Sequence, residues 1–138
     1  MQPHVRNCAQ IFALIAFMWT AGGCDRQLRG IQEVARINSP GKQMDLVVAE
    51  VTAGATVSAP YEVYLVAAGK NPTGADVILK IDKSSRPEVA WVNDASAVLK
   101  CERARVWNFR NFGSVATRDR KLLNVSVSLE CGQHGYGP

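Results

Sequence analysis

Apolar and polar residues alternate with a period of two along most of the chain between positions 31 and 131. The clearest example lies near the C-terminal end, where the odd positions are apolar, namely Leu123, Val125, Val127 and Leu129, and the even positions 124–130 are polar. Successive side chains of a strand point to opposite faces of a sheet, so this pattern predicts a strand with one buried and one solvated face.

The same alternation predicts about seven strands. They cover residues 34–38, 43–50, 61–68, 77–82, 89–92, 98–101 and 122–130. Turn-forming sequences separate them, such as Ser39-Pro40-Gly41-Lys42, in which Pro presets its own φ and Gly41 is expected to take a positive φ. Each connection is short enough for antiparallel neighbours and too short for a helical crossover. The predicted fold class is all-β, a single antiparallel meander domain that forms a sandwich or small barrel.

One stretch, residues 102–112, departs from the alternation and is expected to form either one or two helical turns or a short irregular strand. Its last five residues, 108–112, mix exposed polar groups with two phenylalanines outside any clean alternation, which makes this stretch the first candidate for a contact surface. The residues proposed for that surface are Arg105, Trp107, Asn108, Phe109, Arg110, Asn111 and Phe112. For most aromatic residues of the chain, packing into a small core is the favoured interpretation.

The N-terminal residues follow a different pattern. His4 and Arg6 precede an uninterrupted apolar run over 11–19, and small residues at 20–23 lead to Cys24. This order predicts a secretory signal peptide over 1–23, then a tether over 24–30, the β domain over 31–131 and a flexible tail over 132–138. A spanning anchor is the alternative, but it needs roughly 20 apolar residues, and Asp25 ends this run early.

The residues around the expected cleavage site, Ala21-Gly22-Gly23-Cys24, resemble the signal of bacterial lipoproteins. That resemblance implies that Cys24 carries a lipid and becomes the mature N-terminus, which would tether the protein to a membrane of the cell envelope, facing the periplasm. Asp25 resembles the inner-membrane retention residue of enteric-type sorting. Position 21 is Ala where the family usually has Leu, so a free or disulfide-bonded Cys24 after ordinary cleavage stays an alternative.

The net charge of the chain says little about its binding partners. The chain has 16 Lys and Arg against 12 Asp and Glu, too small an excess to argue for nucleic acid, and export argues against it. Basic residues do gather between 100 and 121, at Lys100, Arg103, Arg105, Arg110, Arg118, Arg120 and Lys121. A solvated face is the favoured interpretation, and contact with anionic lipid headgroups is the alternative.

If Cys24 is lipidated, Cys101 and Cys131 remain as an even pair in an oxidising compartment, which predicts a disulfide between them. Their Cα atoms should then lie about 4.4–6.8 Å apart. Zinc binding with His134 is weakly supported because the chain has no Cys-x-x-Cys, and two reduced thiols are the second alternative.

No catalytic constellation is evident. After cleavage His134 is the sole imidazole, the carboxylates Asp45 and Asp82 follow the solvent-facing positions of strands, and no phosphate-binding loop occurs. The sequence therefore predicts a protein that is not an enzyme and uses neither metal nor cofactor. The function expected is a membrane-tethered binding module for another envelope protein, and the alternative is a structural or accessory subunit of an envelope assembly.

Several segments are similar to a family of small, uncharacterised bacterial exported proteins and lipoproteins. They are the turn 39–42, the loop 54–56, the strand 61–66, the hairpin 91–99 and the segment 108–112, so the similarity spans about residues 31–112. This resemblance implies the β fold and the exported location, and it implies no catalytic residue.

Overall fold

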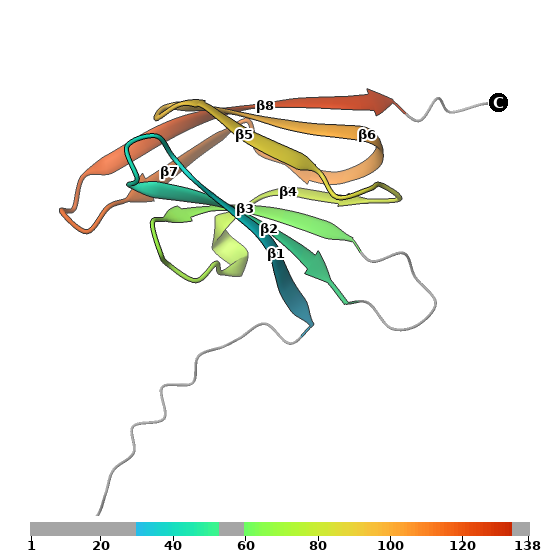
Figure 1. Ribbon diagram of the computed structural model, residues 1–138, viewed down its shortest axis with the longest axis horizontal. Coiled ribbons are helices and arrows are strands. Elements are labelled where there is room, and N and C mark those ends of the chain that lie inside the picture. Colours follow the sequence, from blue (N-terminus) through green and yellow to red (C-terminus); the bar gives the residue numbers. More distant parts are fainter. Residues whose placement is uncertain (1–29, 53–59, 134–138) are drawn as a thin grey trace, which may run out of the picture.

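A computed structural model of the protein describes residues 30–52 and 60–133. It contains eight strands and one 3-10 helix, η1 (Figure 1). In chain order they are β1 (Ile31–Asn38), β2 (Met44–Val51), β3 (Tyr61–Ala67), η1 (Gly74–Asp76), β4 (Val77–Asp82), β5 (Glu88–Asn93), β6 (Ser96–Phe109), β7 (Phe112–Ala116) and β8 (Leu122–Gln133). The all-β prediction is confirmed. The proposed signal peptide and Cys24 lie outside the described residues.

All eight strands belong to one open sheet. Its order is β1-β2-β3-β4-β6-β8-β7, and β5 pairs with β6 away from this path. From β1 to β4 every neighbouring pair is antiparallel, as the short connections predicted. The strands at the two ends of the order, β1 and β7, do not pair with each other, so the sheet does not close into a barrel.

Strand β6 differs most from the prediction, because it runs through the segment 102–109 for which helical turns were one expectation. Its first half lies between β5 and β8, and its second half pairs with β4. The β6–β8 pair is parallel, with Leu99 opposite Leu129, so the prediction of antiparallel neighbours throughout is wrong. The unpredicted strand β7 reverses the chain on the far side of β8, which makes a parallel pair possible without a helical crossover.

The two halves of the sheet share one core. Figure 1 shows β5, β6 and β8 lying over the layer of β1 to β4. Side chains from both layers are buried together, including Leu46 and Leu79 from one and Leu99, Val125 and Val127 from the other. The even positions 124–130 of β8 are exposed, so its predicted alternation is confirmed.

Strand β2 is buried on both faces. A second, smaller cluster lies on the face of the sheet opposite the main core; it consists of Val47, Ala49, Tyr64, Val66 and Val77. The sequence pattern of β2 carried this information, since its run Leu46-Val47-Val48-Ala49 is apolar at four successive positions.

The predicted hairpin turn between β1 and β2 is present, with a hydrogen bond of 2.8 Å from the Lys42 amide to the Ser39 carbonyl. Lys42, not Gly41, has the positive φ of 54°. Gly41 instead makes room for Asp94, because its amide donates to Oδ1 of Asp94 at 2.6 Å and a Cβ there would lie 2.9 Å from Oδ2. Glycine at this position therefore joins the β1–β2 turn to the β5–β6 turn.

Candidate functional site

The candidate contact segment is built mainly from the second half of β6. Asn108 stands opposite Lys80 of β4, and Phe109 stands opposite Leu79. Phe109 packs against the main core, so it is a core residue and not an exposed ring. The paired backbone makes this part of the segment a rigid sheet element.

Trp107 interrupts that pairing. Ile81 stands opposite Val106 and Lys80 opposite Asn108, which leaves Trp107 as the extra residue of a β-bulge. Bulges redirect a side chain away from the regular pleat. Trp107 is 62% exposed, which is unusual for so large an apolar side chain.

The neighbouring Arg105 holds this indole in place. Its guanidinium carbon lies 4.2 Å from the centre of the Trp107 ring, within the range of a cation–π contact. The same guanidinium donates from Nε to Oδ1 of Asp82 at 2.9 Å and from Nη2 to Oδ2, a bidentate arrangement. Asp82 is buried, so the stack rests on a carboxylate that is fixed within the sheet.

Electrostatics agree with that geometry. Hydrogen bonding from Arg105 is the main reason that the pKa of Asp82 lies below its usual value, and hydrogen bonding by the Trp107 side chain lowers the pKa further, against the opposing effect of burial. The carboxylate is therefore ionised at neutral pH and keeps the guanidinium in place. We call Asp82, Arg105 and Trp107 the tryptophan stack.

The rest of the candidate segment does not join this stack. The amide of Arg110 donates to the Ile78 carbonyl and its guanidinium to the Ala75 carbonyl. The Asn111 carbonyl accepts from the Val127 amide. Phe112 is 51% exposed but belongs to β7, paired with β8. Of the predicted surface residues, Arg105 and Trp107 belong to the stack and Phe109 packs against the core, while Asn108, Arg110, Asn111 and Phe112 are exposed outside the stack.

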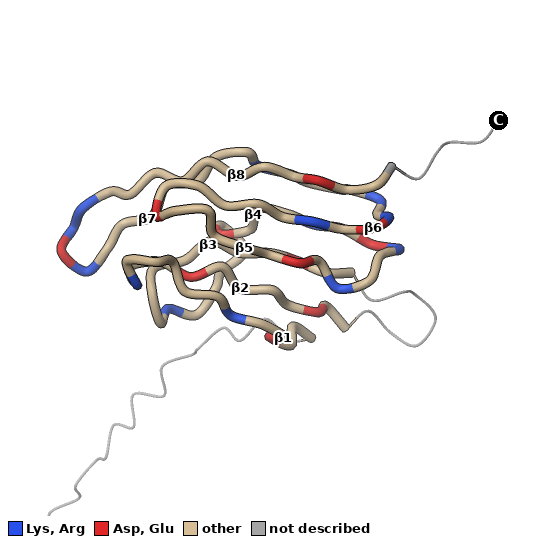
Figure 2. Tube along the Cα trace, turned by 45° about the horizontal axis from the view of Figure 1, so that its top comes forward, with Lys and Arg blue, Asp and Glu red and all other residues tan. Residues whose placement is uncertain are grey.

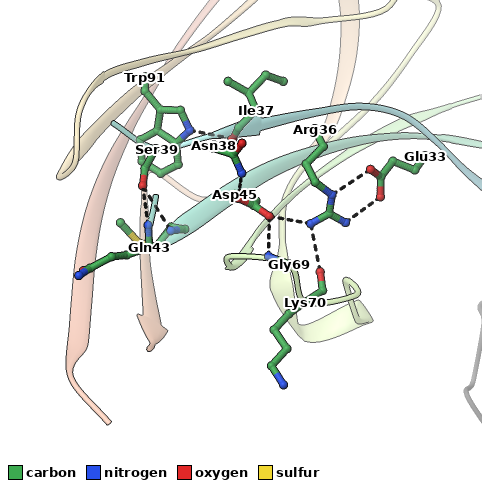
Figure 3. A network of polar contacts seen from close by, with 11 residues as sticks. Glu33, Arg36, Ile37, Asn38, Ser39, Gln43, Asp45, Gly69, Lys70 and Trp91 are labelled. Carbon is green, nitrogen blue, oxygen red and sulfur yellow. Dashed lines mark hydrogen bonds and ion pairs between the residues drawn. The ribbon is translucent and has the colours of Figure 1, made fainter. Parts of the chain in front are cut away.

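A second polar network surrounds Asp45, which is fully buried (Figure 3). Its Oδ2 accepts from Nη1 of Arg36 and from the Gly69 amide, both at 2.8 Å, and its Oδ1 accepts from Nδ2 of Asn38 at 2.6 Å. Arg36 also pairs with Glu33 and donates to the Lys70 carbonyl. The network joins β1 and β2 to the loop after β3.

Every polar contact of Asp45 is inside the protein, which argues for a structural role. Burial raises the pKa of Asp45, but the hydrogen bonds from Gly69, Arg36 and Asn38 outweigh burial, and the pKa lies below its usual value. The prediction that Asp45 and Asp82 are solvent-facing carboxylates is wrong. The arginines that pair with Asp45 and Asp82 belong to other strands, so the sequence of each aspartate's own strand does not reveal its partner.

Cys101 and Cys131 stand opposite each other on the parallel strands β6 and β8 and form a disulfide pair. Their Cα atoms are 4.5 Å apart, within the predicted range. Cys101 does not end a strand as predicted, since β6 continues to Phe109. The bridge therefore joins two adjacent strands inside the sheet.

The basic residues predicted as one stretch are distributed over several surfaces. Lys100 pairs with Glu130 at 3.5 Å, Arg105 with Asp82, and Arg110 with a backbone carbonyl. Arg118, Arg120 and Lys121 lie on the β7–β8 hairpin, which Figure 2 shows projecting at one end of the molecule. The stretch is therefore not a single cationic face.

Among residues 30–52 and 60–133, no group of three or more His, Cys, Asp or Glu side chains is placed to hold a metal ion. Within the same residues, no helix has the length and apolar character needed to cross a membrane. No family model matches the chain, and no curated protein or solved structure matches it either.

Proposed function

We propose that the protein is an exported, membrane-tethered binding module without catalytic activity, and that the tryptophan stack is its recognition surface for another protein of the cell envelope. The observation that carries the proposal is the exposed Trp107 ring, held by Arg105 on the buried Asp82. Tryptophan and arginine dominate the residues that contribute most to protein–protein affinity.

The rigidity of this stack favours binding. A partner that contacts Trp107 meets a ring whose position is set by the bulge in β6 and by Arg105, so little side-chain freedom is lost on association. Asn108, the next residue along β6, is also exposed and offers hydrogen-bonding groups to a partner that contacts this part of the strand.

Two features support the exported location. The order of charged, apolar and small residues before Cys24 resembles a lipoprotein signal, and Asp25 resembles the residue that favours the inner membrane. The Cys101–Cys131 pair suits a compartment in which disulfides persist. Lipid at Cys24 would hold the β domain at the membrane surface.

Location and recognition are tested separately. Replacing Cys24 by Ser should move the protein from the membrane pellet to the soluble fraction of the envelope. Firm retention of Cys24→Ser in the pellet would mean that the apolar segment, and not a lipid, is the anchor.

For recognition, Trp107→Ala should abolish co-purification of a partner with the cross-linked protein from intact cells, whereas Val92→Ala should not. Val92 is a suitable control because it is 66% exposed and lies on β5. Equal loss with both variants would favour the alternative of an accessory subunit that uses much of its surface in an assembly.

A further inference from the structure

Two hairpin turns at one end of the sheet share an unusual backbone feature. In the turn Ser39–Lys42 the Lys42 amide donates to the Ser39 carbonyl at 2.8 Å, and Lys42 has a φ of 54°. In the turn Thr117–Arg120 the Arg120 amide donates to the Thr117 carbonyl at 3.0 Å, and Arg120 has a φ of 59°. Glycine is preferred where φ is positive, yet both turns place a cation there.

The two turns border a common groove. Its volume is about 310 Å³, and it is lined by Lys42, Gln43, Ala67, Ala68, Thr117, Arg118 and Asp119. These residues come from the turn before β2, from the end of β3 and the residue after it, and from the β7–β8 hairpin. Segments far apart in the sequence thus bring Lys42 and Arg118 to one groove.

Several cations at this end of the sheet lack a side-chain partner among the described residues. Within the part of the chain that the structure describes, no ion pair or side-chain hydrogen bond is made by Lys42, Lys70, Arg118, Arg120 or Lys121. Arg36, Lys80, Lys100 and Arg105 form ion pairs, whereas Lys83, Arg86 and Arg103 also make none among the described residues, so the groove is distinguished by the convergence of its cations and not by their lack of partners alone.

Acidic groups offset only part of this charge. Asp119 lies in the same hairpin, and the carboxylate of Asp94 accepts from the Gly41 amide. Figure 2 shows the basic segments of the β7–β8 hairpin and of the neighbouring turns at the same end of the sheet. The end of the sheet is therefore a cationic groove with few counter-charges.

We propose that this cationic groove binds the phosphate group of an anionic ligand, a phosphate ester that is either soluble or part of a lipid headgroup. Lysine and arginine are the side chains that bind phosphate, Arg118 through paired N–H donors and Lys42 as a compact charge. A groove of about 310 Å³ is large enough for one such headgroup. Of the two cations with a positive φ in these turns, Lys42 lines the groove, and its strained backbone conformation agrees with a binding role at that position.

The groove is independent of the tryptophan stack. Asn38 and Asp45 stand opposite each other at the groove end of the β1–β2 pair, and Ile31 and Val51 at the other end. The stack lies toward that other end. Tyr61 of β3 stands opposite Glu50 near the end of β2 and also opposite Ile81 of β4, and Asp82 of the stack directly follows Ile81. Binding of a protein at the stack and of phosphate at the groove can therefore be measured separately.

The test uses the full chain, with inorganic pyrophosphate followed by titration calorimetry and with vesicles of phosphatidylglycerol or phosphatidylcholine followed by sedimentation. The site variant is Lys42→Gln/Arg118→Gln. Its matched control is Lys83→Gln/Arg103→Gln, which removes the same charges near the tryptophan stack, including a second Lys with a φ of 54°. Near-ultraviolet circular dichroism checks that each variant is folded.

The site variant should bind pyrophosphate or phosphatidylglycerol vesicles at least about tenfold more weakly than wild type, while the control loses less than about threefold. Binding to vesicles alone assigns the phosphate to a lipid headgroup, and binding of pyrophosphate as well shows that the groove recognises the phosphate group of soluble ligands too. Equal losses in both variants, or no binding of either probe by wild type, would overturn the proposal. If the double variant does not fold, Arg118→Gln on the exposed hairpin replaces it, with Arg103→Gln as control.

Discussion

The guanidinium of Arg105 lies over the ring of Trp107, 4.2 Å from its centre, and its N–H groups are bound at the same time to Asp82. A buried carboxylate thereby sets the position of an exposed indole, both through the intervening guanidinium and through hydrogen bonding by the Trp107 side chain. Cation–π contact alone contributes about 0.5–1 kcal/mol at an exposed site, so the carboxylate is needed to hold the stack.

Replacing Asp82 by Asn should release this stack. Arg105 loses its ionic partner, and because that side chain is half exposed, the expected loss of stability is only about 1 kcal/mol. In protein labelled with 5-fluorotryptophan, the ¹⁹F resonance of Trp107 should shift and broaden while that of half-buried Trp91 stays in place. Unchanged resonances at both positions would show that Asp82 does not control the ring.

Asp45→Ala should destabilise the domain far more. It leaves Arg36, Asn38 and the Gly69 amide without their shared acceptor, and breaking a buried ion pair typically costs about 3 kcal/mol. Glu33→Gln is the matched control, since it removes the more exposed partner of the same Arg36 and should cost less than about 1 kcal/mol. Urea unfolding measures the free energy of unfolding of both variants. Similar decreases in the two variants would contradict the claim that Asp45 is the main acceptor of this network.

The stability of the folded protein should also depend on pH in a defined direction. Asp45 and Asp82 both have a folded-state pKa below the ordinary value, so each contributes stability above the unfolded pKa of about 3.9 that is lost as the pH falls through the lowered pKa. Unfolding free energy should be nearly constant from about pH 7 to 5 and decrease below about pH 4. Asp45→Asn should flatten that decrease, and an undiminished acid dependence would argue against this assignment.

Removing the disulfide by Cys101→Ala/Cys131→Ala should lower stability by about 2–5 kcal/mol, since the bridge restricts the unfolded chain across a separation of 30 residues. A reductant should lower the thermal midpoint of wild type and leave that of the double variant unchanged. Both sulfurs should resist alkylation in exported, unreduced protein. Rapid alkylation of both would mean that the bridge does not form in the cell.

Lys42→Gly should raise the stability of the protein and weaken its binding of phosphate. Glycine relieves the positive φ and should raise the unfolding free energy by about 1 kcal/mol, while loss of the cation weakens phosphate binding at the groove. Lys83→Gly, at the other positive-φ lysine, should gain similar stability without affecting phosphate binding. A Lys42→Gly variant that binds phosphate as wild type does would remove Lys42 from the site.

Much of the fold follows from the period-two pattern, because a strand with one buried face shows its alternation in its own residues. The face of β8 is predicted correctly for this reason, whereas β2, β3 and β4 are buried on both faces and are predicted from short apolar runs bounded by turns. The extent of β6 is missed because its two halves have different neighbours, and its exposed second half does not alternate between apolar and polar residues. The short β7 lacks a clear pattern because one of its buried positions is Gly113, which packs closely against the side chain of Leu65.

The candidate site follows the same rule. Arg105 and Trp107 fall within the seven-residue candidate surface because the segment 102–112 departs from the alternation, but the sequence does not single them out from the other five residues. Asp82 and Asp45 are missed because their burial depends on arginines from other strands. Lys42 is not connected with Arg118 in the sequence, since only the folded sheet brings their turns together.

Site-specific photo-cross-linking in living cells tests the recognition surface most directly. A photoreactive phenylalanine analogue at Asn108 leaves Trp107 intact beside it, and the same analogue at Val92 probes β5, away from the stack. Illumination should give one adduct of defined mass from position 108, none from position 92, and none from position 108 when Trp107 is also replaced by Ala. The same adducts from both positions, or an adduct at 108 that survives Trp107→Ala, would contradict recognition through the tryptophan stack.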